Sequence, residues 1–209
     1  QRLADELAAR ASRLENQSYL VTLFGAFSAG KSSFANALLG ENLLPVSPNP
    51  TTAVIQKILP VTKERPHGTV RVHIKDEAML LADLNRALKP FGREAANLAE
   101  APGLVAEALA LESELRQQQA FLRAYDKGRA AFERRAGTTL SCGLAEFADY
   151  AVTEEKACFI EEIEIYSDCA LTRKGITLVD TPGADSINAR HTDLSFRFIR
   201  QSDAILFVT

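Results

Sequence analysis

The stretch Gly25-Ala26-Phe27-Ser28-Ala29-Gly30-Lys31-Ser32 decides the fold of this chain. It fits the pattern G-x-x-x-x-G-K-[ST], and both of its flanks agree with that pattern. Residues 19–24 are mainly apolar and partly β-branched, which predicts a buried strand. Residues 33–40 have a helical pattern that ends at a glycine. A strand, a glycine loop and a helix in this order predict a phosphate-binding loop, whereas a plain glycine turn beside a surface lysine would not need those flanks.

The spacing within the loop suits the phosphates of a nucleotide. Gly25 and Gly30 permit backbone conformations that turn successive N–H groups toward an anion, and the helix that follows directs its positive end at the same place. Lys31 can reach the β- and γ-phosphates, and Ser32 offers its hydroxyl to Mg²⁺. We therefore expect the nucleotide to contact Gly25, Ala26, Phe27, Ser28, Ala29, Gly30, Lys31, Ser32 and Ser33.

A second motif, residues 175–183, is an apolar strand that ends in an aspartate and a Pro-Gly turn. Ligands of parallel α/β sheets gather at the carboxyl ends of strands, so Asp180 is placed to hold Mg²⁺ directly or through a water. Gly183 leaves its N–H free to approach a γ-phosphate. D-T-P-G by itself is more typical of an ordinary strand-to-loop turn. The phosphate loop upstream favours the functional interpretation.

Between these motifs, residues 44–55 carry three prolines and two threonines. The prolines exclude a helix and predict a loop of restricted shape before an apolar strand. Thr52 can give its hydroxyl to Mg²⁺ and its backbone to the attacking water, and we prefer it to Thr51 because it is nearer the strand. The alternative is a Pro-rich connector whose threonines merely begin the strand. The predicted metal ligands are therefore Ser32, Thr52 and Asp180.

Together, these motifs resemble the GTPase domain of bacterial dynamin-like proteins. The resemblance is carried by G-A-F-S-A-G-K-S-S-F-A-N-A-L-L-G, by L-L-P-V-S-P-N-P-T-T-A-V-I and by L-V-D-T-P-G-A-D-S, and it covers about residues 18–75 and 156–209. It implies an α/β phosphate-loop GTPase fold, with a mainly parallel sheet flanked by helices. It also implies Mg²⁺-dependent hydrolysis of GTP to GDP, coupled to pairing of GTPase heads and to membrane fusion or fission.

Two positions depart from the usual catalytic residues of such enzymes. Eukaryotic dynamins carry a glutamine that positions the attacking water where this chain has Phe27, and small GTPases carry one after D-x-x-G, where it has Ala184. Catalysis is therefore assigned to Ser28, Lys31 and Thr52, helped by the metal and by a partner head. We expect slow hydrolysis by an isolated head. The alternatives are a nucleotide-gated scaffold with little hydrolysis, and a regulatory or assembly GTPase.

Guanine specificity rests on the resemblance alone. The base-reading motif [N/T]-K-x-D would follow the strand at the end of the chain, and the sequence stops at Thr209. Because this end falls inside a predicted strand, we expect the chain to be part of something larger.

The composition indicates the surroundings in which the protein works. The net charge is −3 and no Lys/Arg-rich run occurs, which argues against nucleic acid as a partner. No apolar run reaches the ~18 residues of a membrane span. Cys142, Cys158 and Cys169 lack C-x-x-C spacing and predict reduced thiols, and the three histidines show no metal-ligand spacing. With the resemblance, this predicts a cytoplasmic protein, peripheral at the inner face of the membrane, which it contacts through regions outside this chain. A second GTPase head, in a homodimer or a tandem, is the other expected partner.

The middle of the chain, residues 76–155, shifts to Ala, Leu, Glu, Arg and Gln with helical periodicity. It predicts a helix over 79–88, one long helix or two over 103–135, and a third over 140–152. Residues 157–166 then become strand-like. We interpret 76–155 as a helical insertion that either packs on the core or offers a docking surface to a partner head or another domain.

At the amino-terminal end, residues 1–17 place Leu3, Leu7, Ala11 and Leu14 along one helical face. This pattern predicts an amphipathic helix. Its mixed charges and lack of aromatic residues disfavour a membrane surface, so we expect it to pack against a partner helix in a bundle. The predicted organisation is this helix (1–17), a GTPase core (18–75 and 156–209) and the insertion (76–155).

Overall fold

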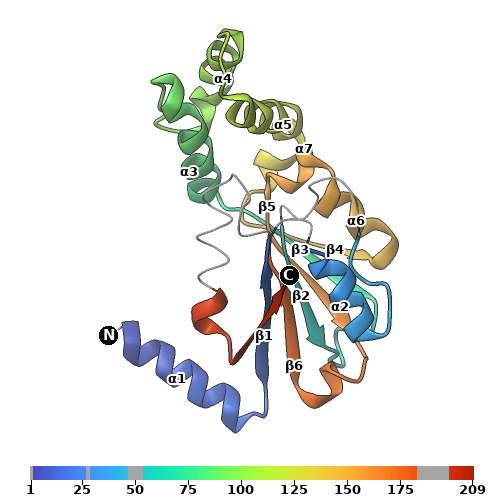
Figure 1. Ribbon diagram of the computed structural model, residues 1–209. Coiled ribbons are helices and arrows are strands. Elements are labelled where there is room, and N and C mark those ends of the chain that lie inside the picture. The colour runs from blue at the N-terminus through green and yellow to red at the C-terminus, as the bar shows by residue number, and fades with distance from the viewer. Residues whose placement is uncertain (1, 27–28, 47–53, 183–197) are drawn as a thin grey trace.

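A seven-stranded sheet forms the centre of the computed structural model, which describes residues 2–26, 29–46, 54–182 and 198–209 (Figure 1). The order across the sheet is β4-β3-β5-β2-β6-β1-β7. The strands are β1 (Tyr19–Gly25), β2 (Ile55–Pro60), β3 (Thr69–Ile74), β4 (Thr139–Gly143), β5 (Ile160–Ser167), β6 (Ile176–Asp180) and β7 (Ala204–Val208). The predicted α/β fold, with its sheet flanked by helices, is confirmed.

Parallel and antiparallel pairs occur in equal number among the described strands. β1 pairs in parallel with β6 and β7, and β2 pairs in parallel with β5. The pairs β2–β6, β3–β5 and β3–β4 are antiparallel, so the sheet is more mixed than the sequence predicted. The reason is that β2 begins beside the end of β6, with Gln56 opposite Asp180, and must run away from that edge.

The helices follow the sequence prediction closely. They are α1 (Arg2–Glu15), α2 (Lys31–Leu39), α3 (Glu77–Leu88), α4 (Ala101–Ala110), α5 (Arg116–Phe132), α6 (Leu144–Val152) and α7 (Glu154–Ala157), with residues 198–201 also helical. Short 3-10 turns lie at Lys89–Phe91, Leu98–Glu100, Glu133–Arg135 and Thr172–Lys174. The stretch 103–135 forms two helices rather than one.

Helices α3, α4 and α5 lie together beyond the end of the sheet where β1 ends (Figure 1). Among their contacts with the rest of the chain, α5 packs on α7, and Asp83 of α3 forms a 3.1 Å ion pair with Lys75, which follows β3. Gly128 permits this approach, because a Cβ there would lie 2.0 Å from the backbone oxygen of Glu155. A glycine inside a helix weakens it, and this close approach explains why a glycine stands at position 128. The division of the chain into a core and an insertion stays a prediction.

Two details of this region differ from the sequence prediction. Residues 140–143 were expected to begin a helix, but they belong to the edge strand β4, which pairs with β3. Residues 157–159 were expected to be strand-like, but α7 ends at Ala157 and β5 begins at Ile160. Pairing with β3, rather than local periodicity, decides the first difference, whereas the second depends on where α7 ends.

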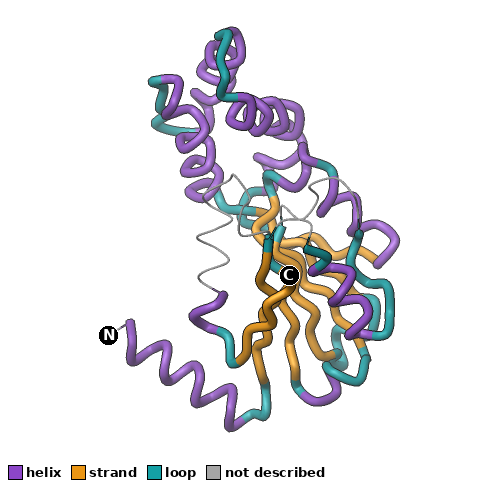
Figure 2. Tube along the Cα trace, viewed as in Figure 1, coloured by secondary structure: helices purple, strands orange, loops and turns teal. Residues whose placement is uncertain are grey.

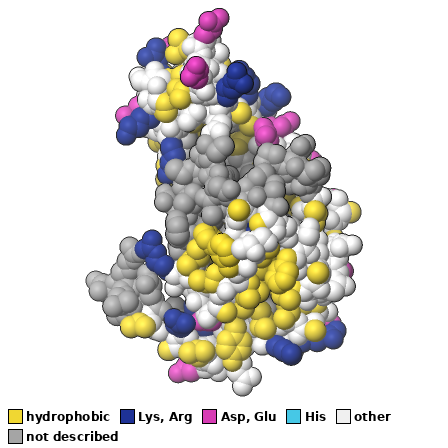
Figure 3. Space-filling model, viewed as in Figure 1, with side chains coloured by type: hydrophobic (Ala, Val, Ile, Leu, Met, Phe, Trp, Pro, Cys, Tyr) yellow, Lys and Arg dark blue, Asp and Glu magenta, His cyan; other side chains and the backbone are white. Residues whose placement is uncertain are grey.

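Hydrophobic side chains pack on both faces of the sheet. On one face, Leu23 of β1 joins Ala35 and Leu39 of α2 in the large core, which continues beneath α3 to α7. On the other face, a smaller cluster contains Ile55, Val179 and Phe198. In the view of Figure 3, apolar side chains gather over the lower half of the molecule and charged ones over the upper helices.

The amino-terminal helix α1 joins β1 at the end of the sheet opposite to α3–α5 (Figure 2). Arg10 and Arg13 of α1 form ion pairs with Asp203, just before β7. Leu7 and Leu14 are more than half exposed. The predicted helix is confirmed, and its packing against a partner helix stays a prediction. Within the described part of the chain, no helix combines the length and apolarity that crossing a bilayer requires.

Candidate nucleotide and metal site

The predicted phosphate loop joins β1 to α2, as the sequence indicated. Gly25 ends β1 so close to β7 that a Cβ there would lie 2.1 Å from the backbone oxygen of Val208. Gly30 precedes α2 in the left-handed conformation, with φ 83° and ψ 21°. Both positions require glycine for reasons of backbone geometry. The helix that begins at Lys31 therefore has its N-terminal end at the loop.

Lys31 lies inside this turn although it carries a charge. Its side chain is buried, and Nζ donates hydrogen bonds to the carbonyl oxygens of Gly25 at 3.1 Å and Ala26 at 2.8 Å. A buried ammonium group is stable only among acceptors or anions. The loop thus holds a fixed positive charge, suited to the phosphates that the sequence predicted.

The two predicted metal ligands that the structure describes meet across the sheet. Ser32 Oγ donates to Asp180 Oδ2 at 2.5 Å, although the two residues are 148 positions apart. Asp180 is fully buried, and its Oδ1 has no hydrogen-bond partner among the described residues. Burial raises the pKa of Asp180 to about 6, against the lowering effects of the Ser32 hydrogen bond and the Lys31 charge.

These two residues fit a magnesium ion. Mg²⁺ prefers oxygen ligands and is commonly held by one or two carboxylates with several waters. A buried carboxylate oxygen without a partner is costly in a folded protein, and a cation or its water would satisfy it. The donor set is therefore compatible with the ion that the sequence predicted.

Thr181 is a residue beside Asp180 that was not predicted to contribute to the site. Its hydroxyl donates to the carbonyl oxygen of Leu23 at 2.8 Å, and it is fully buried. Leu23 is also the Cα partner of Asp180 in the β1–β6 pair. Thr181 thus ties the end of β6 to the strand that carries the phosphate loop. The motif D-T-P-G contains this signal, but the structure is needed to interpret it.

Asn36 is a second residue that sequence reasoning missed. One turn after Ser32 on α2, its amide donates to the carbonyl of Leu44 at 2.9 Å and accepts from the N–H groups of Leu43 and Leu44 at 3.1 and 2.8 Å. Asn36 is buried, as are both leucines. It therefore fixes the chain where it leaves α2 toward the predicted first switch.

The remaining predicted site residues divide into two groups. Ala26 and Ala29 lie in the loop, where the Ala29 N–H bonds to the Ala26 carbonyl at 3.3 Å, and Ser33 is exposed on the outer side of α2. The others lie outside the described residues, and their roles stay predictions. They are Phe27, Ser28, Thr51, Thr52, Gly183 and Ala184.

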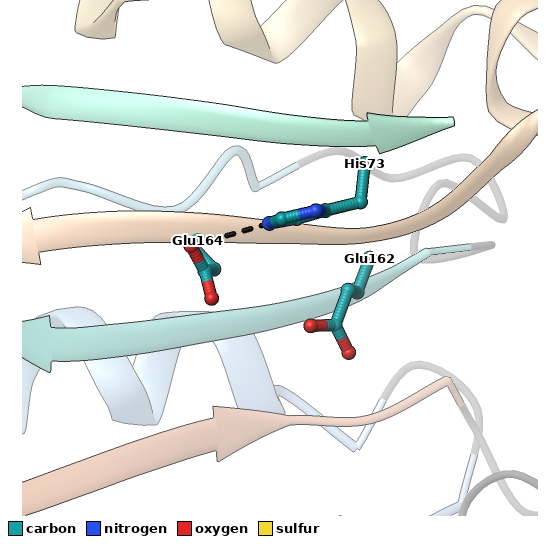
Figure 4. Close-up of side chains that lie close together, drawn as sticks. All are labelled: His73, Glu162 and Glu164. Atoms are coloured by element: carbon teal, nitrogen blue, oxygen red, sulfur yellow. Dashed lines mark ion pairs between the residues drawn. The ribbon is translucent and has the colours of Figure 1, made fainter. Parts of the chain in front are cut away.

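A second cluster of ionisable groups occupies the opposite face of the sheet. The ligand atoms of His73, Glu162 and Glu164 all lie within 4.8 Å of one another (Figure 4). Each carboxylate already has a cation, since Lys57 pairs with Glu162 at 2.6 Å and Arg71 with Glu164 at 3.0 Å.

The charges of this cluster are therefore balanced without a metal. Burial alone would raise the pKa of Glu164, but the hydrogen bond and charge of His73, with Tyr166 and Arg71, hold it below its usual value. A divalent cation would be repelled by Lys57 and Arg71. We assign this cluster a structural role in joining β2, β3 and β5.

The fold and the loop define the class to which the chain belongs: an α/β phosphate-loop protein. More particularly, it belongs to the dynamin family, a family of GTPases, because residues 21–209 match that family's model.

Individual relatives agree with this family. Dynamin-like protein A of Bacillus subtilis is 40% identical over 204 residues, which are 96% of this chain and 17% of that protein. The bacterial dynamin-like protein of Nostoc punctiforme is 29% identical over 98% of this chain and 22% of its own length. The chain thus spans less than a quarter of either relative.

Solved structures support the fold. A structure described by the words "An oligomerised bacterial dynamin pair provides a mechanism for the long range sensing and tethering of membranes" aligns with a TM-score of 0.64. The alignment covers 99% of this chain and 29% of that one, at 20% identity. At this identity the likeness concerns the fold alone.

Proposed function

We propose that this chain is the GTPase head of a bacterial dynamin-like protein, which binds GTP with Mg²⁺ and hydrolyses its terminal phosphate. The observation that carries this proposal is the meeting of Ser32 with a buried Asp180, beside a lysine held inside the phosphate loop. Family membership supports guanine as the base.

Each residue has a distinct part in this reaction. Lys31 and the backbone N–H groups of the loop bind the phosphates, and α2 directs its positive end at them. Ser32 and Asp180, with Thr52, would hold Mg²⁺, which when bound neutralises phosphate charge. Ser28 and the Thr52 backbone orient the attacking water, and Gly183 N–H binds the γ-phosphate.

Hydrolysis by a single head is slow in this proposal. Phe27 and Ala184 stand where other GTPases carry a water-orienting glutamine, so a partner head must complete the site. The measurement is turnover per head against protein concentration. We expect the rate to rise with concentration, and a fast rate that is independent of concentration would refute the need for a partner.

Pairing of heads would couple the nucleotide state to membrane remodelling. The structural neighbour is described as an oligomerised pair that senses and tethers membranes, which supports the same kind of action here. In this proposal the protein is cytoplasmic and peripheral at the inner face of the membrane, which it contacts through regions outside this chain. Liposome flotation of the natural full-length protein with GDP or a non-hydrolysable GTP analogue tests this. Absence of liposome binding in both states would oppose it.

Single-turnover hydrolysis tests directly whether the protein cleaves GTP. GTP should be cleaved in preference to ATP, and Lys31→Ala should abolish both binding and cleavage. Lys174→Ala is a suitable control because Lys174 is exposed and distant in sequence from the loop. The rival function, a nucleotide-gated scaffold, is favoured by Phe27 and Ala184, and it predicts tight GTP binding without measurable cleavage.

A further inference from the structure

Gln56 is a buried polar residue with no role in the reaction proposed above. It lies in β2 with 1% of its surface exposed, and its neighbours on the same face, Val54 and Ile58, belong to the large apolar core. Its side-chain oxygen, Oε1, has no hydrogen-bond partner in the described ranges. A buried amide oxygen without a partner is unfavourable, so its presence calls for an explanation.

The position of Gln56 in the sheet supplies that explanation. Gln56 is the Cα partner of Asp180 in the antiparallel pair of β2 with β6. Directly opposite residues point to the same face of a sheet, with Cβ atoms about 4.5–5.5 Å apart. Asp180 Oδ1 is also buried and also without a partner among the described residues. Two neighbouring residues on the face of the predicted metal site thus each carry a buried side-chain oxygen without a partner in the described ranges.

Only a hydrogen-bond donor can bond to both Gln56 Oε1 and Asp180 Oδ1. The amide oxygen and the ionised carboxylate are both acceptors, so they cannot bond to each other, and a group that bridges them must bring two hydrogens. Water does so, and a water polarised by a cation is a stronger donor. Mg²⁺ in proteins usually keeps several of its waters.

We propose that Gln56 is a positioning residue of the metal site, whose Oε1 accepts a hydrogen bond from a water of the magnesium hydration shell that also donates to Asp180 Oδ1. This inference rests on the proposed function and adds a residue to it. The role differs from that of the glutamines missing at positions 27 and 184, because Gln56 acts on the water shell of the ion and not on the attacking water.

The decisive variant is Gln56→Met, which keeps the length of the side chain and removes the amide. The assay is binding of a fluorescent GDP to the natural full-length protein over a range of Mg²⁺ concentrations. We expect the Mg²⁺ concentration for half-maximal binding to rise about tenfold, as for other residues that orient metal ligands. GDP affinity in EDTA should stay within about twofold. The melting temperature in EDTA should not fall, since the Gln56 side chain has no hydrogen bond to lose among the described residues.

Gln119→Met is the matched control, because Gln119 is also buried but has partners. Its amide donates to the carbonyl oxygen of Leu111 at 2.9 Å, far along the chain from the loop. Its loss should lower the melting temperature and leave the Mg²⁺ dependence unchanged. We therefore expect Gln56→Met to change the Mg²⁺ dependence but not the melting temperature, and Gln119→Met to do the reverse.

Gln56→Leu also removes the amide but has a different shape, so it distinguishes the loss of the amide from a change in packing. It replaces Gln56→Met if that variant does not fold. Agreement of the two variants in Mg²⁺ dependence supports the proposal. The proposal is overturned if, in either folded variant, the Mg²⁺ concentration for half-maximal GDP binding stays within twofold of the wild-type value. It is also overturned if the melting temperature in EDTA falls enough to account for the weaker binding. If GDP binding to the wild-type protein does not depend on Mg²⁺, the proposed function fails too. If only the variants behave like wild type, the role of Gln56 fails and the proposed function stands.

A structure with GDP and Mg²⁺ gives an independent test. We expect a water within hydrogen-bond distance of both Gln56 Oε1 and Asp180 Oδ1. A direct bond between the Gln56 amide and the Asp180 carboxylate, with no water, would overturn the proposal.

Discussion

Asp180→Asn should stabilise the metal-free chain while it abolishes the metal site. Asp180 is fully buried, and burial raises its pKa to about 6 from the usual 3.8. A carboxyl group whose pKa rises on folding favours the folded state when it is protonated. That contribution is complete below about pH 4 and is lost as the pH rises through about 6.

The magnitude follows from the size of the pKa change. About two pKa units correspond to roughly 3 kcal/mol of unfolding free energy, of which about 2 kcal/mol fall between pH 4.5 and pH 8. Asparagine carries no charge, so it escapes this loss. The stability of the variant relative to wild type should therefore be greater at pH 8 than at pH 4.5 by about 2 kcal/mol.

Urea unfolding of the 1–209 chain in EDTA at the two pH values measures this difference. In parallel, Mg²⁺-dependent binding of GDP to the natural full-length protein should disappear in the variant. A relative stability that is the same at both pH values would show that Asp180 does not carry the cost of a buried charge. A cation would then not be needed to stabilise this carboxylate.

Three further substitutions test the elements that hold the site. Asn36→Ala removes three buried hydrogen bonds and should lower the free energy of unfolding by about 2–4 kcal/mol, whereas Asn42→Ala, exposed in the same loop, should change it by less than about 0.5 kcal/mol. Equal effects in urea unfolding would contradict this. Thr181→Val should lower it by about 1–3 kcal/mol and weaken Mg²⁺-dependent GDP binding, and Thr181→Ser, which keeps the hydroxyl, should restore binding. Gly25→Ala places a Cβ 2.1 Å from the backbone of β7 and should prevent nucleotide binding, whereas Gly103→Ala in α4, where nothing lies within 4 Å, should stabilise by about 0.5–1 kcal/mol. Wild-type GDP affinity in the Gly25 variant would refute the packing argument.

The sequence predicted the parts of the fold that depend on short-range signals. The loop was recognisable because its glycines and lysine have fixed spacing, and α3 because an apolar stripe recurs at helical spacing over residues 79–88. β4 was not recognisable, since its five residues alternate between exposed and half-buried and stay in the sheet only through pairing with β3. A strand of this kind is defined by its partner more than by its own residues.

The candidate site shows the same limit. The meeting of Ser32 with Asp180 followed from a general rule, because ligand-binding residues gather at the carboxyl ends of parallel strands. The contributions of Asn36 and Thr181 did not follow, since both act by hydrogen bonds to backbone groups that no side-chain pattern reveals. Their types were visible in the motifs, but their partners were not.

Gln56 illustrates what only the register of a sheet can decide. In the strand I-Q-K-I-L-P, a glutamine and a lysine stand side by side between apolar residues, and the pattern does not indicate which of them faces inward. The register places Gln56 opposite Asp180 and leaves Lys57 on the other face, where its ammonium group lies 5.1 Å from the ring of Phe198. A slip of one residue would exchange these roles. β2 therefore contacts the predicted metal site on one face and the helix at 198–201 on the other, so a change at Gln56 tests the metal site without disturbing the contact made by Lys57.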